Sequence, residues 1–370
     1  MKITDIKVHL LSFPLTNKWI TSGGAMGKRD TIIIQLFTDE GIIGYGEAHH
    51  AKAHLVVAQI IENVLKPIVL GADPFYHPLI FQAMYERVFL MGQAGISISA
   101  ISGIEMALWD IVGKSLGVSV SQLLGRCQDK IRVYAGGASL GWQSPGELVQ
   151  EALSLVDRGF TALKLRIGRG VKLDLQAVEA VAIAVGEEVD LIVDANCGYE
   201  RQKAMQLARE LGNYNILWLE EPLPYNDLHG YKLLAQKTIT PLAAGENFFT
   251  LYGFQTALSI GSFNILQPDC CKTGGISESY KIASLASSLH LNCALHIFGG
   301  AIGLAASLQV LGSIRNGIIC EYDGLQHQPL RDDLVSQPFE LENGYLKIPN
   351  SPGLGVEPIL KNFKKYPYFD

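Results

Sequence analysis

The sequence lacks several features that would mark other classes of protein. Charged residues make up only 18% of its 370 residues, the formal net charge is −6, and like charges do not run together. These values argue against nucleic acid and anionic membranes as partners. No uninterrupted apolar run is long enough to cross a membrane, and the N-terminal residues alternate like a strand rather than forming a signal peptide. A small molecule is therefore the expected partner.

Cysteine is sparse, and its spacing forms no framework. The six cysteines lie in or beside apolar, strand-like runs, and no CxxC spacing occurs. This pattern argues against structural zinc and against the disulfide scaffold of a small secreted protein. We expect a reducing, cytoplasmic setting.

Apolar residues are abundant, at 48%, and they follow two rhythms. Residues 1–50 alternate as three strands with glycines at the turns. Residues 54–69 and 97–116 carry apolar side chains at helical spacing. This order of strands and then helices predicts an α+β capping domain over residues 1–125.

The rest of the chain repeats a shorter unit. Strand-like runs start near residues 131, 161, 190, 216, 241, 263, 292 and 318, and amphipathic segments fill the gaps between them. The spacing is that of a βα unit, but a Pro- and Gly-rich tail replaces an eighth long helix. The pattern predicts a (β/α)7β TIM-like barrel over residues 126–323, with a C-terminal segment, residues 324–370, that returns to the capping domain.

Three acidic residues recur at an even distance through this half of the chain. Asp194, Glu220 and Glu246 are 26 residues apart each time, and each follows an apolar run. A buried carboxylate is costly unless a cation meets it, and the strand ends of a barrel converge on one mouth. Three carboxylates without cysteine or histidine suit a hard cation, so Mg²⁺ is the expected metal and Mn²⁺ the alternative.

The period of two along each strand places further polar side chains on the same inner face. Singly, a residue of this kind at a strand end is usually an ordinary polar side chain or a helix cap; together they indicate a site. His296 is the expected general base, because its unperturbed pKa lies near neutrality, and Asp269 would fix its tautomer. The remaining inner-face candidates are Lys164, Arg166, Asn196 and Glu321.

These residues resemble the enolase superfamily and, within it, the mandelate racemase subgroup, over nearly the whole chain. The stretches SISAISGIEMALWDIVGK and LQPDCCKTGGISESYKIASLA are similar to sugar-acid lactone cycloisomerases of that subgroup. The muconate-lactonising subgroup usually has Asp as third ligand and Lys on the sixth strand, which Glu246 and Asp269 argue against. The resemblance implies a homo-oligomer and the following roles: metal ligands Asp194, Glu220 and Glu246, a catalytic dyad of His296 and Asp269, an acid at Glu321, and a substrate-binding residue at Asn196.

One motif departs from the family. Its second strand commonly carries Lys-x-Lys, whose second Lys is a base, whereas this chain has Lys164-Leu165-Arg166. A guanidinium is always protonated and is a poor proton acceptor. One-base chemistry is therefore favoured, with Arg166 pairing with a carboxylate or an enolate oxygen.

The sequence thus favours a Mg²⁺-dependent lyase or isomerase that abstracts the α-proton of a sugar acid or its lactone. As a sugar-acid dehydratase or lactone cycloisomerase, it would catalyse β-elimination through a metal-stabilised enediolate. Two alternatives stay open: a racemase or epimerase of a 2-hydroxy acid, which needs a second base, and a metal-binding barrel without catalytic activity.

Several segments are expected to play lesser roles. The Gly-rich stretch Trp19–Met26, expected as a loop, and the segment from Glu47 to His50 are candidate lids over the barrel mouth. Asp323 is expected to cap a loop, and Lys272 to lie in the turn that starts a helix.

Overall fold

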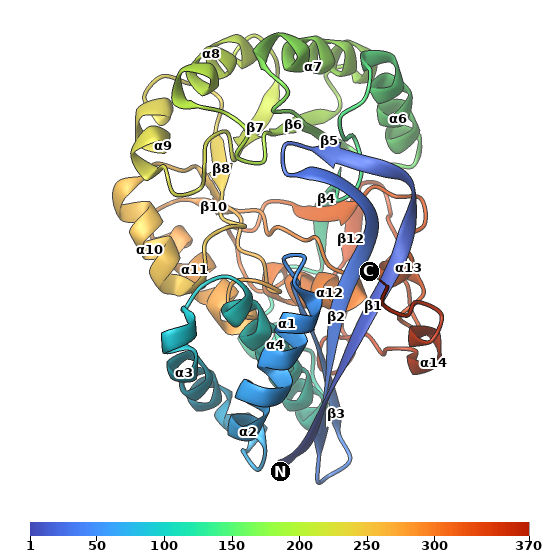
Figure 1. The fold of residues 1–370 in the computed structure, drawn as a ribbon. Helices are drawn as coiled ribbons and strands as arrows, with labels where there is room; N and C mark the ends of the chain where they lie inside the picture. The colour runs from blue at the N-terminus through green and yellow to red at the C-terminus, as the bar shows by residue number, and fades with distance from the viewer. Residues whose placement is uncertain (370) are drawn as a thin grey trace.

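The computed structural model describes residues 1–369 and begins with an antiparallel sheet. Its strands are β1 (Ile3–Thr21), β2 (Gly24–Thr38) and β3 (Ile43–Ala48), in the order β1-β2-β3. The first two form a long ribbon whose turn reaches over the barrel (Figure 1). Trp19 pairs with Met26 in this ribbon. The stretch Trp19–Met26 is therefore the end of a hairpin rather than the expected loop, because strand pairing resumes after an irregularity between Pro14 and Trp19 and continues to Thr21 and Gly24.

Helices follow the sheet, as the sequence predicts. They are α1 (His54–Gln59), a π-helical segment (Ile60–Leu65), α2 (Lys66–Val69), α3 (His77–Arg87), α4 (Ile96–Leu116) and α5 (Val120–Leu124), with 3₁₀ turns at Pro74–Tyr76 and Phe89–Met91. α4 packs closely on the sheet, since a Cβ added at Gly46 would lie 1.8 Å from the carbonyl oxygen of Gly103. Only glycine permits this approach.

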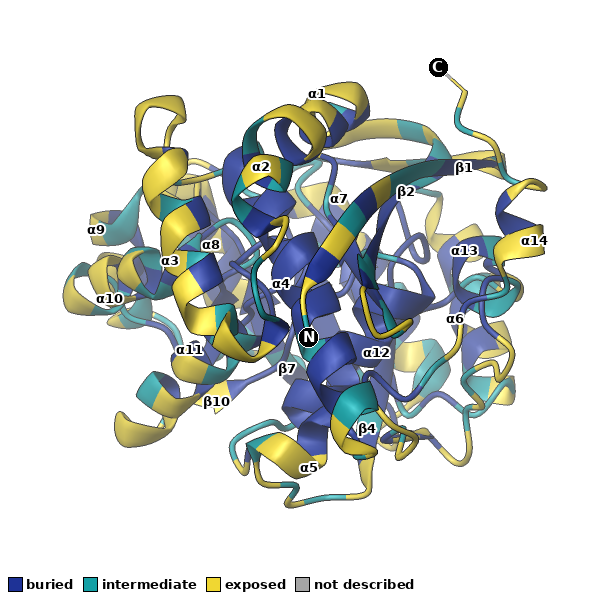
Figure 2. Cartoon of the chain, turned by 90° about the horizontal axis from the view of Figure 1, so that it is seen from below, coloured by how far each residue is buried: buried dark blue, intermediate teal, exposed yellow. Residues whose placement is uncertain are grey.

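α4 is long and apolar enough to cross a membrane by length and composition alone, but 89% of its most apolar stretch is buried inside the protein. Polar residues such as Glu105 and Asp110 interrupt it. Figure 2 shows α4 and α12 (Ala301–Leu311) as dark, buried helices in the middle of the molecule. α4 is therefore a core helix.

The predicted barrel is present, with all eight strands. They are β4 (Lys130–Gly136), β5 (Ala162–Arg166), β6 (Asp190–Asp194), β7 (Ile216–Glu220), β8 (Leu242–Ala244), β9 (Ile265–Leu266), β10 (Asn292–Cys293) and β11 (Cys320–Asp323). They pair in parallel in the order β10-β9-β8-β7-β6-β5-β4-β11. A parallel bridge between Cys293 and Gly317 joins the two ends of this order. The sheet thus closes on itself.

Seven helices connect these strands, again as predicted. They are α6 (Pro145–Asp157), α7 (Val171–Val185), α8 (Arg201–Leu211), α9 (Leu228–Ala235), α10 (Thr250–Ile260), α11 (Ile276–Ser288) and α12. α6 to α11 form an arc around the outside of the strands (Figure 1). α12 differs, because all of its residues are buried and it contacts β3 of the capping sheet.

The end of the chain contacts both earlier parts. β12 (Tyr345–Lys347) pairs with the start of β4; α13 (Pro329–Asp332) precedes it in the chain and α14 (Leu360–Phe363) follows it. Pro367 then forms a bridge with Leu11 on β1. The domain boundaries themselves, 1–125, 126–323 and 324–370, stay a prediction.

Side chains inside the barrel form layers. One apolar layer consists of Tyr134, Ala162, Ile192, Trp218, Ala243, Ile265, Ala294 and Ile319. Because side chains of a strand alternate between its faces, the residue two positions later on each strand forms the next layer, towards the carboxyl ends. That layer contains Lys164, Asp194, Glu220, Gln267, His296 and Glu321. The apolar layer is therefore the floor of a polar site.

Candidate active site

Three carboxylates from neighbouring strands form the centre of the site. Oxygen atoms of Asp194, Glu220 and Glu246 lie within 4.8 Å of one another. Asp194 and Glu220 are fully buried and face each other in register on β6 and β7. Glu246 breaks the alternation of β8, because Gly245 has a φ of +151° and redirects the chain. These oxygen donors fit Mg²⁺, and Mn²⁺ less specifically.

Two buried cations lie against this carboxylate cluster. Lys164 Nζ lies 2.8 Å from Glu220 Oε1 and 3.0 Å from Glu321 Oε1. Arg166 forms an ion pair with Asp194, and its Nη2 lies 3.6 Å from Glu321 Oε1. Burial opposes the charged forms, but the neighbouring carboxylates outweigh it and raise the pKa of Lys164 and of Arg166. Both side chains are therefore fixed positive charges rather than proton acceptors.

The predicted His–Asp pair is assembled beside the carboxylates. His296 Nδ1 lies 2.7 Å from Asp269 Oδ2, and His296 Nε2 lies 3.2 Å from Glu246 Oε2. Burial disfavours the imidazolium, but the charge of Glu246 and the hydrogen bond to Asp269 raise the pKa of His296 to about 9. Asp269 is held in turn by the backbone N–H of Cys271. The pairing orients Nε2 towards the ligand cluster.

Asn196 lies two residues beyond Asp194, above the polar layer, and Gln267 belongs to that layer. The backbone N–H of Asn196 donates to Asp194 Oδ1 at 2.7 Å, and its side-chain amide donates to Asp194 Oδ2 at 3.2 Å. Asn196 therefore orients a metal-ligand candidate. Its Oδ1, and both amide atoms of buried Gln267, have no hydrogen-bond partner among the described residues. These atoms remain free for a ligand or water.

Two residues of the site were missed in the sequence. Glu221 is buried and accepts hydrogen bonds from Asn247 Nδ2 at 3.0 and 2.9 Å, and burial together with the charge of Glu246 raises its pKa to about 8. Glu221 has a positive φ of 37°. This backbone turn interrupts the alternation of side chains between the two faces of the strand, on which the prediction of inner-face residues relied. Lys272, expected only in a turn, brings its Nζ to 4.0 Å from Glu246 Oε1. Its position three residues after Asp269 was the available signal.

A pocket of about 440 Å³ opens above the polar layer. Arg166, Asn196, Glu246 and His296 line its barrel side. The capping sheet supplies the other side with residues of the hairpin end, among them Trp19 and Met26, and with the pair His49 and His50. Both candidate lid segments therefore lie at the pocket.

The β1–β2 hairpin end is bonded to the barrel. The hydroxyl of Ser22 donates to the carbonyl oxygens of Ala195 and Asn196, and the ring of Trp19 lies 5.1 Å from the guanidinium of Arg166. Asp323 accepts from the backbone of Leu325, as expected of a loop cap.

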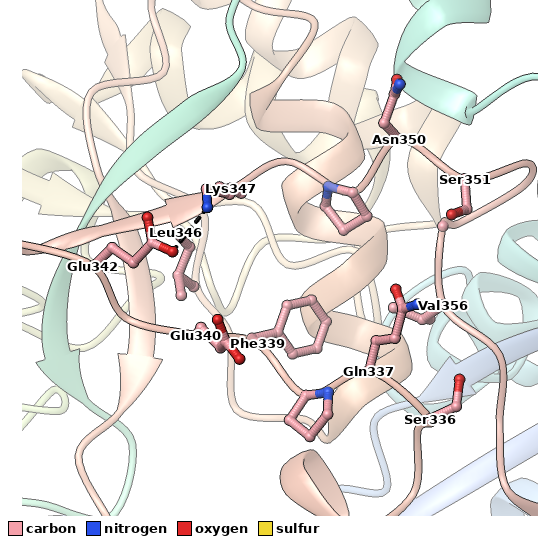
Figure 3. A pocket seen from close by; sticks show the side chains of 13 residues that line it. Ser336, Gln337, Phe339, Glu340, Glu342, Leu346, Lys347, Asn350, Ser351 and Val356 are labelled. Carbon is pink, nitrogen blue, oxygen red and sulfur yellow. Dashed lines mark hydrogen bonds and ion pairs between the residues drawn. The ribbon is translucent and has the colours of Figure 1, made fainter.

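Two other clusters in the described part of the chain do not form comparable sites. A hollow of about 500 Å³ beside β12 (Figure 3) contains the ion pair of Glu342 with Lys347, and it lies at the opposite end of the barrel, where β12 pairs with the start of β4. Asp30, His50 and His54 also lie together. However, the two imidazole rings stack at 4.0 Å with 17° between their planes. An ion cannot lie in both ring planes in that arrangement.

Comparison with known proteins places the chain in a family. The family described as Enolase C-terminal domain-like matches residues 147–361, and the Mandelate racemase / muconate lactonizing enzyme, N-terminal domain matches residues 6–125. The chain is 35% identical to D-galactarolactone cycloisomerase of Agrobacterium fabrum, with 96% of each chain covered. It is 33% identical to D-xylonate dehydratase of Haloferax volcanii, over 89% of this chain and 84% of the relative.

Solved structures agree with this placement. A member of the enolase superfamily from Polaromonas sp. JS666 matches with a TM-score of 0.96 at 36% identity, covering 100% of this chain and 98% of that one. A racemase from Streptomyces coelicolor A3(2), with bound magnesium, matches with a TM-score of 0.91 at 28% identity, covering 98% and 99%. From its fold, its site and these relatives, the chain belongs to the enolase superfamily of enzymes, in the mandelate racemase-like branch that contains lyases and isomerases.

Proposed function

We propose that the protein is a Mg²⁺-dependent lyase or isomerase that removes the α-proton of a sugar acid or its lactone and then eliminates the β-oxygen. The observation that carries this proposal is the His296–Asp269 pair, at 2.7 Å, beside three clustered carboxylates. The named activities of the relatives, a lactone cycloisomerase and a sugar-acid dehydratase, support the substrate class.

The carboxylates of Asp194, Glu220 and Glu246 would hold the ion. When bound, it would supply positive charge beside the substrate carboxylate, which makes the α-proton more acidic. Lys164 and Arg166 add fixed positive charge at the same place, where burial strengthens its effect on a developing anion.

Proton transfer is assigned to His296. Its Nε2 takes the α-proton, and the Asp269 carboxylate stabilises the imidazolium that results. The electron pair of the broken C–H bond forms a double bond to the β-carbon as the C–O bond there breaks. Burial favours the neutral form of Glu321, but Lys164, His296 and Arg166 outweigh it and lower the pKa of Glu321. The return of the proton is therefore assigned to His296 rather than to Glu321. From a sugar acid the leaving hydroxyl takes up this proton and departs as water. From the lactone of a diacid, whose ring oxygen is bonded to the β-carbon, the leaving oxygen stays in the product as a carboxylate and the proton goes to the β-carbon of the enol.

The racemase alternative requires a base on each face of the α-carbon. Lys164 and Arg166 are the basic residues that the second strand offers, and buried carboxylates keep both protonated. A single base, His296, favours elimination over racemisation.

A panel of sugar acids, diacids and their lactones tests the proposal. The purified protein is treated with chelator, Mg²⁺ is restored, and α-keto acid and ring-opened products are measured. We expect turnover of at least one member that is lost with chelator, recovered with Mg²⁺ and absent in His296→Asn. No turnover across the panel, or deuterium exchange at the α-carbon of both configurations, would overturn it.

A further inference from the structure

The backbone that carries His296 receives little support from the barrel sheet. β10 ends at Cys293, three residues before His296, and α12 begins only at Ala301. Between them, the N–H of His296 donates to the carbonyl of Pro268 at 3.2 Å, and the N–H of Ile297 donates to Glu321 at 3.1 Å. The rest of this segment needs other anchors to hold a defined position.

Glu47, on capping strand β3, anchors the end of this segment and the first turn of α12. Its Oε1 accepts the N–H of Gly300 at 2.6 Å, and its Oε2 accepts the N–H of Gly303 at 2.7 Å. The hydroxyl of Thr31 donates to Oε1 as well. A Cβ added at Gly299 would lie 2.7 Å from Oε1, so the glycines of the segment fit closely around the carboxylate.

Arg29, on the neighbouring strand β2, holds the middle of the same segment. Its Nη2 donates to the carbonyl of Phe298 at 2.9 Å, and its guanidinium stacks 3.6 Å from the centre of the Phe298 ring. Its Nη1 lies 3.1 Å from Asp323 Oδ2 at the end of β11. The guanidinium therefore joins the His296 segment to the next strand.

The same capping strand also reaches Asp269, the partner of His296. The N–H of His49, two residues after Glu47, donates to the carbonyl of Cys271 at 3.0 Å. The N–H of Cys271 donates in turn to Asp269 Oδ1 at 2.7 Å. The end of β3 thus contacts both chain segments of the catalytic pair.

We infer that Glu47 is a positioning residue that sets the His296–Asp269 hydrogen bond from the capping domain. The inference rests on the proposed role of His296 as the base. A carboxylate is required because both of its oxygens accept backbone N–H groups; an amide would turn one NH₂ group against an N–H. The segment would then move, and His296 with it.

Glu47→Gln tests this inference with two readings. The first is the Nδ1–H proton resonance of His296 in the Mg²⁺-free protein without substrate, identified by its loss in His296→Asn. The second is the kinetic pair kcat and KM. We expect the resonance to shift or broaden, and kcat to fall about 10- to 100-fold with little change in KM, because a small misplacement of a catalytic group costs that much.

Asp110→Asn is the matched control. Asp110 is another buried capping-domain carboxylate that accepts two backbone N–H groups, from Tyr45 and Leu354. It also pairs with Lys114 at 2.8 Å, and it contacts neither segment of the pair. Asp110→Asn should lose at least as much stability as Glu47→Gln and leave both readings unchanged. Thr31→Val, which removes only the hydroxyl that holds Glu47, should change both readings in the same direction by less.

The outcomes separate cleanly. If Glu47→Gln and Thr31→Val leave the resonance and kcat as in the wild type, or if Asp110→Asn changes them equally, the inference is overturned. Should Glu47→Gln fail to fold, Thr31→Val decides. Because the resonance needs neither substrate nor turnover, it tests Glu47 even if the wild type acts on no sugar acid, a result that would count against the proposed function alone.

Discussion

The two halves of the site are built differently. Asp194 and Glu220 end regular strands of five residues each, and they pair in register within the barrel. Asp269 and His296 lie beyond strands of two residues each, and their segments are bonded to β2 and β3 of the other sheet. Barrel strands therefore place Asp194 and Glu220, the ion half, and the capping sheet adds only the Ser22 hydroxyl beyond Asp194. The base half, Asp269 and His296, is held by backbone contacts from both domains.

This difference suggests how the two halves respond to change. The ion half depends on strand pairing, which resists local substitutions outside the barrel. The base half depends on contacts between residues about 250 positions apart, such as Glu47 with Gly300, 253 residues away. Changes in the capping domain should therefore alter proton transfer before they alter metal binding.

His296→Asn should break the base half and leave the ion half intact. We expect kcat to fall by about 10²- to 10⁴-fold, the usual contribution of a general base, with Mg²⁺ affinity nearly unchanged. Steady-state kinetics and calorimetric titration of Mg²⁺ check this. A comparable loss of Mg²⁺ affinity would show that the halves are not separable.

Glu220→Gln should weaken Mg²⁺ binding and leave the His296–Asp269 pair intact. At 100 times its Kd, Mg²⁺ is expected to raise the free energy of unfolding of the wild type by about 2.7 kcal/mol, and this gain should disappear in the variant. Denaturant unfolding with and without Mg²⁺ measures it. The His296 Nδ1–H resonance should remain; its disappearance would contradict independence of the base half.

Asp269→Asn sharpens the description of the base half. In the Mg²⁺-free protein, the pKa of His296 is raised to about 9, so its imidazole becomes neutral only as the pH rises through that value. Loss of the carboxylate removes part of that rise, so the titration should move to lower pH. NMR of labelled histidine checks the direction. Activity with Mg²⁺ should fall about 10- to 100-fold.

Ser22→Ala tests the hairpin end, where the effect should be smallest. Loss of the hydroxyl contacts with Ala195 and Asn196 should cost about 1 kcal/mol, roughly fivefold in KM, with kcat nearly constant. Ser259→Ala is the control, since Ser259 is exposed and bonds only within α10. An equal change in KM in both variants would show that the hairpin end does not contribute to substrate binding.

Much of the fold could be predicted from the sequence because its signals are local. The spacing of apolar runs located all eight barrel strands, and alternation placed Lys164, Asp194, Glu220 and His296 on the inner face. Alternation does not account for Glu246 or Glu221, because Gly245 has a φ of +151° and Glu221 one of +37°. Backbone turns of this kind interrupt the period of two on which such reasoning depends.

The contribution of the capping domain could not be predicted in the same way. Glu47 was located at a strand end, but nothing local to it indicates that its partners are Gly300 and Gly303. Pairing of that kind arises only when the two sheets are packed. The roles of the site residues themselves remain predictions that the variants above address.

The burial of α12 limits how this chain can be divided. All eleven of its residues are covered, although it is one of the connecting helices that in the rest of the ring expose one face to solvent. A barrel produced without the capping domain would expose the apolar surface of α12 to water, next to the segment that carries His296. Exposed apolar surface of this kind promotes aggregation. A capping domain from a relative could therefore replace this one only under two conditions. Its sheet must bury the apolar surface of α12, and it must supply a hydrogen-bond acceptor for the backbone N–H groups of the first turn of α12.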